Sequence, residues 1–165
     1  SNGKVVNFFT GSLVIDGQNQ PSQSLTLKRG VARFDLNVDV AGSAAIESLT
    51  LKNVAQSGYL FAQGEVAASP ADVERNDVTA HFDTALSAST PGVLYVYEQE
   101  NAGIEVSIEA VIDGQHKVLT KTLEGNLKRN TIYTVTVRKN DIDIVVKVGI
   151  DDWEPGEDTE IIPQL

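Results

Sequence analysis

Two histidines are the side chains best suited to acid-base or metal chemistry in this sequence. His81 falls within an expected strand and His116 beside an expected hairpin turn, far apart in the chain. Neither has a second imidazole at the short spacing that is typical of zinc ligands. No serine lies in a Gly-x-Ser-x-Gly elbow, which is the usual local framework for a nucleophile. The sequence therefore predicts a non-enzymatic protein with no catalytic residues, no metal ligands and no cofactor.

The densest run of carboxylates lies close to the end of the chain. Oxygen-rich clusters can hold calcium, but this run lacks the alternating Asp-x-Asp-x-Asp-Gly spacing of a calcium loop. We interpret it as a solvated acidic tail. The run comprises Asp151, Asp152, Glu154, Glu157, Asp158 and Glu160.

Charge and composition limit the partners of the chain. The net charge of -10 and the isoelectric point of about 4.5 disfavour binding to nucleic acid or to anionic lipid. The sequence has no apolar run of about 18 residues, the length that a membrane-spanning helix needs. It contains neither cysteine nor methionine. We expect an export signal or lipid anchor to lie upstream, so that any contact with a membrane is made through that anchor.

Alternating apolar and polar residues predict strands along most of the chain. The clearest pattern is a hairpin with strands at 131–138 and 142–150 around Lys139-Asn140-Asp141. A one-sided strand is expected at 31–40, and a second hairpin at 104–112 and 118–123 around Asp113-Gly114. A single helical turn is expected at 69–74, where a serine precedes a proline. These patterns predict an all-β fold, an antiparallel β-sandwich.

The stretch at 87–92 has the composition of a linker, with small residues, a proline and a glycine. It divides the chain into an expected N-terminal sandwich domain at 1–90 and a C-terminal one at 91–165. The alternative is one continuous sandwich, in which this stretch is a loop.

Three segments of the chain carry recognisable motifs. They are Leu25 to Leu36, which contains an Arg-x-Ala-Arg-like strand, Leu94 to Asn101, and Leu127 to Val137, which contains Arg129-Asn130-x-x-Tyr133. Together and in this order, they resemble the fimbrillin-type pilins of Bacteroidetes. The resemblance implies a transthyretin-like sandwich that is exported as a lipoprotein to the outer membrane. It also implies a role in adhesion as a stalk, anchor or tip subunit, with other fimbrial subunits, including copies of itself, as partners.

Such a subunit could assemble by adding a strand from one chain to a sheet edge of another. The strand that fits best alternates strictly and is apolar on one face. Its apolar face comprises Ile142, Ile144, Val146, Val148 and Ile150. The sequence does not identify residues that bind a host or bacterial receptor.

The alternative function is a carbohydrate-binding sandwich from a surface glycan-uptake system. That function needs exposed aromatic side chains on which sugar rings can stack. Tyr59 is the candidate contact, because Tyr95, Tyr97, Tyr133 and Trp153 lie in or beside apolar strand patterns that predict packing.

Overall fold

The computed structural model describes residues 9–10, 28–59 and 67–148, and within these ranges the regular elements are all strands. No helix in this part of the chain is long and apolar enough to cross a membrane. In chain order the strands are β1 (Phe9–Thr10), β2 (Lys28–Arg29), β3 (Val31–Val38), β4 (Ala44–Ala55), β5 (Arg75–Leu86), β6 (Thr90–Tyr97), β7 (Glu105–Ile112), β8 (Gln115–Thr122), β9 (Thr131–Val137) and β10 (Ile142–Val148).

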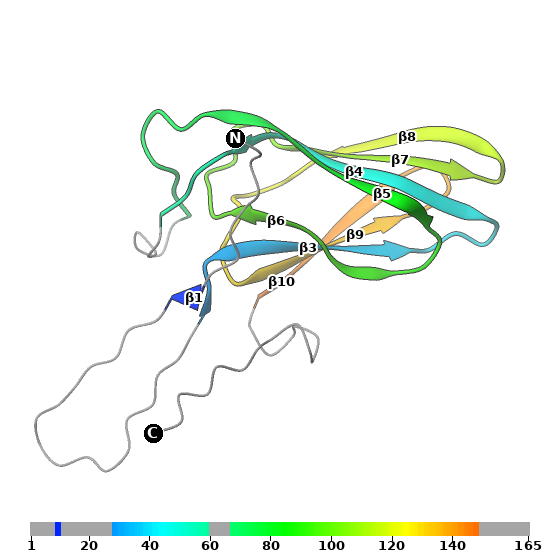
Figure 1. Cartoon of the computed structure of the whole chain (residues 1–165), viewed down its shortest axis with the longest axis horizontal. Coiled ribbons are helices and arrows are strands. Elements are labelled where there is room, and N and C mark those ends of the chain that lie inside the picture. The colour runs from blue at the N-terminus through cyan, green and yellow to red at the C-terminus, as the bar shows by residue number, and fades with distance from the viewer. Residues whose placement is uncertain (1–8, 11–27, 60–66, 149–165) are drawn as a thin grey trace, which may run out of the picture.

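Two four-stranded sheets form the two layers of the molecule (Figure 1). One sheet has the order β10-β9-β3-β6 and the other has the order β5-β4-β7-β8, while β1 and β2 form a small separate pair. β3 and β9 run parallel, and the other described pairs are antiparallel. The prediction of an all-β antiparallel sandwich is confirmed, with the parallel pair β3–β9 as a difference from it.

The core lies between the two sheets and is built from alternate residues of each strand. Phe34 on β3 and Leu49 on β4 are both fully buried, as are Ile108 on β7 and Val135 on β9. Successive side chains of a strand point to opposite faces, so the alternation seen in the sequence places every second residue in this layer.

Both expected hairpins are present. β9 and β10 pair from Val137 with Ile142 to Thr131 with Val148, so Lys139 and Asn140 lie in the turn between them. In the β7–β8 hairpin, Asp113 and Gly114 have φ values of 49° and 78°. Two consecutive positive φ angles define the type I′ turn, whose twist matches that of the flanking strands.

The expected helical turn at 69–74 is wrong. Residues 71 and 72 form a turn, and β5 begins at Arg75. Asp72 has a φ of 56°, a left-handed conformation that ends a helix instead of continuing one. The capping pattern is the same for a helix and for an isolated turn, because serine, proline and acidic residues favour both.

Strands from both sides of the expected boundary at residues 90 and 91 are neighbours in each sheet. β3 lies between β6 and β9, and β4 lies between β5 and β7. Because the described strands of both halves share the two sheets, we propose the alternative of one continuous sandwich.

We predict that the protein unfolds in a single cooperative transition. Scanning calorimetry should give a calorimetric enthalpy equal to the van't Hoff enthalpy. Fragments 1–90 and 91–165, expressed alone, should lack a thermal transition, because each would lose central strands of both sheets. Two separable transitions, or a folded fragment, would instead show two domains.

Candidate functional site

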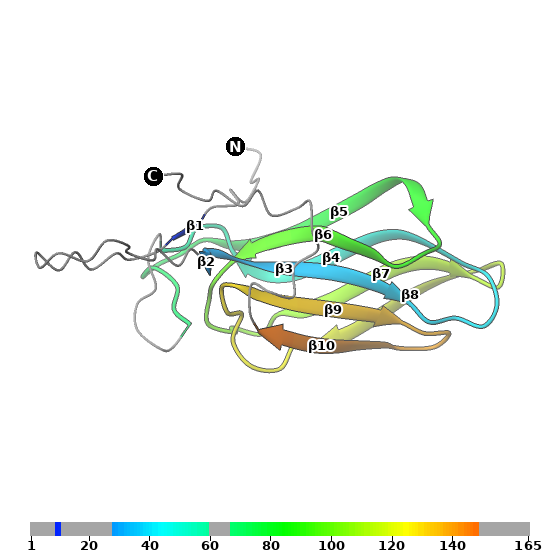
Figure 2. The same cartoon turned by 90° about the horizontal axis from the view of Figure 1, so that it is seen from below.

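β10 is an edge strand of its sheet. It pairs with β9 on one side, and no other described strand is hydrogen-bonded to it. Figure 2 shows β10 at the outer side of the sheet, next to β9. An edge strand presents backbone N–H and C=O groups that can pair with another chain.

Burial falls steadily along the inward face of β10. Ile142 is 2% exposed and Ile144 is half-buried, whereas Val146 is 50% and Val148 is 67% exposed. Ile142 and Ile144 pack in the core as the sequence pattern indicates. The apolar alternation of this strand predicts that its whole apolar face lies against the core, and this prediction is wrong for Val146 and Val148. Ile150, the fifth residue of the predicted assembly strand, lies outside the described residues.

The open edge exposes the backbone of alternate β10 residues. The N–H of Asp39 donates to the Val137 carbonyl at 2.9 Å, so this carbonyl faces away from β10. In an antiparallel pair, residues that face each other alternate between exchanging hydrogen bonds and turning their backbone groups outward. Because Val137 pairs with Ile142, the outward set on β10 is Ile142, Ile144, Val146 and Val148. The Ile144 N–H accordingly donates to the Asp143 carboxylate at 2.9 Å instead of to β9.

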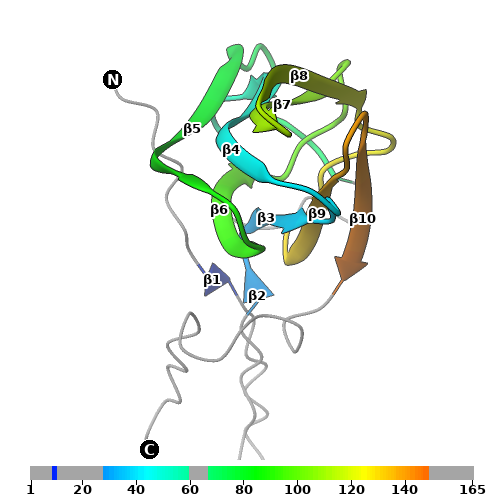
Figure 3. The ribbon, with the colours of Figure 1, turned by 90° about the vertical axis from the view of Figure 1, so that its right-hand side faces the viewer.

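A groove of about 290 Å³ runs beside this edge, between β10 and the end of β8. The two strands lie on the same flank of the sandwich (Figure 3). Lys121 donates to Asp143 across the groove at 3.1 Å, and this hydrogen bond lowers the pKa of the Asp143 carboxyl. The groove is lined by Lys121, Thr122, Leu123, Glu124, Asp143, Ile144 and Val146.

Lysines on the inward face of β8 partly close this flank. Lys117 and Lys121 share that face with the buried Leu119. Lys117 donates to the Lys139 carbonyl and to the Asn140 side chain, both at 2.9 Å. Inward-pointing charges on an edge strand hinder uncontrolled pairing of that edge. On this side of the sandwich, where β8 and β10 lie next to each other, the part that stays open is the edge of β10 beyond Ile144.

The aromatic residues do not form an exposed platform in the described part of the chain. Tyr133 is 2% exposed and stacks on Phe34, with ring centroids 5.1 Å apart. Tyr59, Tyr95 and Tyr97 are half-buried. Trp153 lies outside the described residues. Among the residues whose burial is described, the exposed large hydrophobic side chains are valines: Val118, Val145, Val146 and Val148.

The segments that carry the family resemblance meet at one end of the sandwich. Arg129 donates from Nε to Glu98 at 3.1 Å, and its backbone N–H donates to the same carboxylate at 3.2 Å. Its guanidinium also donates to the Tyr59 carbonyl at 2.8 Å. The Tyr133 hydroxyl accepts from the Lys128 N–H and donates to the Asn126 carbonyl. These residues fix the entry to β9.

Two further polar residues of these segments have structural roles. Arg33 is 1% exposed and forms a two-pronged ion pair with Asp35, at 2.7 and 2.8 Å. Asn101 accepts from the N–H groups of Gly103 and Ile104 and donates to the Leu123 and Gly125 carbonyls. Both side chains form hydrogen bonds with polar groups that would otherwise lack a partner, which would destabilise the fold.

The two histidines have different surroundings. His81 is exposed on β5. His116 on β8 lies beside Glu47 of β4 and Glu109 of β7. Sequence reasoning missed this grouping because its members come from three strands and share no local motif. The acidic run from Asp151 to Glu160 lies outside the described residues.

The family model of the bacterial Ig-like domain matches residues 63–147, about half of the chain. The chain belongs to the bacterial Ig-like domain family. No curated protein matches this Ig-like chain.

Solved structures share the fold of this Ig-like chain at low sequence identity. A protein of Parabacteroides distasonis is 17% identical with a TM-score of 0.50, over 76% of this chain and 53% of that one. A protein of Bacteroides uniformis is 14% identical with a TM-score of 0.50, over 74% and 51%. A third, from Bacteroides ovatus, is 10% identical with a TM-score of 0.51, over 76% and 48%. Each of the three is described as a proposed cell adhesion protein. The chain spans about half the length of these proteins.

We predict that Arg129→Ala lowers the free energy of unfolding by about 3 kcal/mol, because the substitution leaves the Glu98 carboxylate nearly buried without its cation. Urea denaturation measures the change. Lys52→Ala is the matched control, since it removes an ion pair with Glu105 in which both side chains are exposed. An Arg129→Ala variant as stable as Lys52→Ala would contradict this role of the pair.

We predict that ionisation of the Tyr133 hydroxyl lowers the free energy of unfolding above pH 10. Burial raises the pKa of the Tyr133 hydroxyl in the folded protein, whereas the unfolded chain ionises at about pH 10. The unfolded state therefore loses a proton first, and the free energy of unfolding decreases as the pH rises. Tyr133→Phe removes this contribution. The variant should therefore be less stable than the unaltered protein at pH 8, and the difference between their free energies of unfolding should be smaller at pH 10.5. An unchanged deficit in urea denaturation would show that the hydroxyl does not titrate differently on folding.

Proposed function

We propose that this Ig-like chain is a non-enzymatic structural and adhesive subunit of a bacterial surface fimbria, and that it assembles by β-strand addition. The observation that carries the proposal is the open edge of β10. There, the backbone groups of Val146 and Val148 face outward, and both side chains are at least half exposed.

An added strand would gain two kinds of interaction at this edge. Main-chain hydrogen bonds to the outward backbone groups of β10 would give affinity without depending on sequence. The adjoining groove, with Leu123, Ile144 and Val146 in its lining, offers a place for an apolar side chain of the incoming strand. Removing these apolar groups from water would stabilise the complex.

The surface location and the adhesive role rest on the relatives. The three similar structures come from Parabacteroides and Bacteroides and are described as proposed cell adhesion proteins. The sequence segments that resemble fimbrillin-type pilins support the fimbrial version of this role. We propose other fimbrial subunits, including copies of this chain, as partners, and attachment to the outer membrane through a lipid anchor upstream.

The glycan-binding alternative has less support. Tyr59, its candidate contact, is half-buried, and its carbonyl accepts a hydrogen bond from Arg129. No pair of exposed aromatic side chains occurs among the residues whose burial the structure describes. A stacking platform for sugar rings is therefore not present in that part of the chain.

We predict that the native protein, extracted from its cell surface in detergent, runs as a ladder at subunit spacing without boiling and as a monomer after boiling. Val146→Lys should abolish the ladder, because a lysine at the open edge opposes strand addition. An immunoblot with and without boiling measures this outcome.

Val118→Lys is the matched control for this experiment. Val118 is 55% exposed and Val146 is 50% exposed, and both lie on edge strands, but Val118 is on the outer face of β8. The control should keep the ladder. A single monomer band from the unaltered protein would contradict a polymerising subunit, and loss of the ladder in both variants would contradict assembly at β10.

A further inference from the structure

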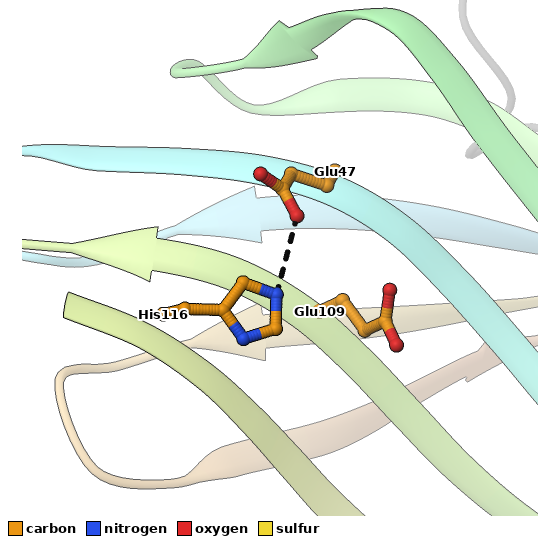
Figure 4. A group of neighbouring side chains, drawn as sticks. All are labelled: Glu47, Glu109 and His116. Carbon is orange, nitrogen blue, oxygen red and sulfur yellow. Dashed lines mark ion pairs between the residues drawn. The ribbon is translucent and has the colours of Figure 1, made fainter.

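Three potential metal ligands converge on the outer face of the second sheet. Glu47, Glu109 and His116 come from the neighbouring strands β4, β7 and β8 and lie side by side (Figure 4). One ligand atom of each lies within 4.8 Å of the others. His116 Nε2 is 3.4 Å from Glu47 Oε2.

A β-bulge on β4 places both Glu47 and Ser48 opposite Glu109. Ile46 pairs with Ala110 and Ser48 with Glu109, so Glu47 is the extra residue on β4. Ile46 and Leu49 are both fully buried in the core, which leaves Glu47 and Ser48 together on the outer face. The Ser48 hydroxyl lies 3.4 Å from Glu109 Oε2. Ile46 and Ala110 form a buried pair, so the next residues along the two strands, Glu47 and Glu109, face outward together. The bulge adds Ser48 to the same face.

The ligand types, and the separation of His116 from Glu47, fit a single divalent cation such as zinc. Zinc binds imidazole nitrogen and carboxylate oxygen at about 2.0 to 2.1 Å, so two ligands of a tetrahedral site lie about 3.3 Å apart. The separation of 3.4 Å between His116 and Glu47 is close to this value. An imidazole ligand favours zinc over calcium or magnesium, which prefer oxygen ligands alone.

The electrostatic environment also favours a cation. Two carboxylates meet at the site, and the ion pairs found for the described residues give Glu47 only His116 as a partner and give Glu109 none. Glu47 and His116 are 44% and 56% exposed, so an ion could enter and keep one coordination position open to solvent.

We propose that Glu47, Glu109 and His116 form a zinc-binding site on the outer face of this sheet. The site is remote in the fold from the open edge of β10, because it lies on the face of β4, β7 and β8 that points away from the core. Zinc binding and strand addition can therefore be tested separately.

The test is titration of ZnCl₂ into the full chain without an affinity tag, followed by calorimetry and by NMR of the two imidazole rings. We expect one zinc ion per chain and a selective shift of the His116 ring signals. His116→Ala should weaken binding by about tenfold or more, and Glu47→Gln and Glu109→Gln should each weaken it measurably.

His81→Ala is the control, since it removes the other histidine of the chain from a neighbouring strand of the same sheet. It should leave the zinc affinity unchanged. Circular dichroism checks that each variant is folded, which we expect because the three side chains lie at the surface. The proposal is overturned if zinc does not bind, if it shifts both imidazole rings equally, or if His116→Ala binds as tightly as the unaltered chain.

Discussion

The parallel pairing of β3 with β9 is the constraint on which the rest of the sandwich depends. It joins a strand from early in the chain to one more than ninety positions later, in register from Ala32 with Thr131 to Val38 with Val137. The stacked rings of Phe34 and Tyr133 lie on this pair at the centre of the core. Nearby, Arg129 and the Tyr133 hydroxyl anchor the entry to β9 through Glu98 and the Asn126 carbonyl. β9 therefore lies between β3 and β10, and β10 is an edge because no other described strand pairs with its far side.

The exposure of β10 follows from where β8 ends. Lys117 of β8 reaches the turn before β10, and Lys121 reaches Asp143, so the two strands run alongside each other. β8 ends at Thr122, and the part of β10 beyond Ile144 extends past it. Val146 and Val148 therefore keep an inward orientation, and no described strand lies opposite to cover them. The same strand thus contributes to the core at its start and has an open edge at its end, where we propose that assembly occurs.

Local patterns in the sequence predicted the elements whose causes are local. Period-two alternation gave the β9–β10 and β7–β8 hairpins, and Asp113-Gly114 indicated the turn between β7 and β8. The exposure of Val146 could not be predicted, because it depends on the length of a strand in the other sheet. The grouping of His116 with Glu47 and Glu109 depends on how three strands pair, which no spacing along the chain reveals. The exposure of Val146 and the grouping of His116 with Glu47 both depend on residues that are far apart in the sequence.

The most direct test of the assembly edge is amide hydrogen exchange along β10, measured by NMR on the monomer and after dissolution of exchanged fibres. In the monomer, Val145 and Lys147 should be protected by β9, while Val146 and Val148 exchange rapidly. In the fibre, Val146 and Val148 should become protected as well, because an added strand would accept their hydrogen bonds. If these two amides exchange equally fast in both states, β10 is not the edge at which the chain assembles.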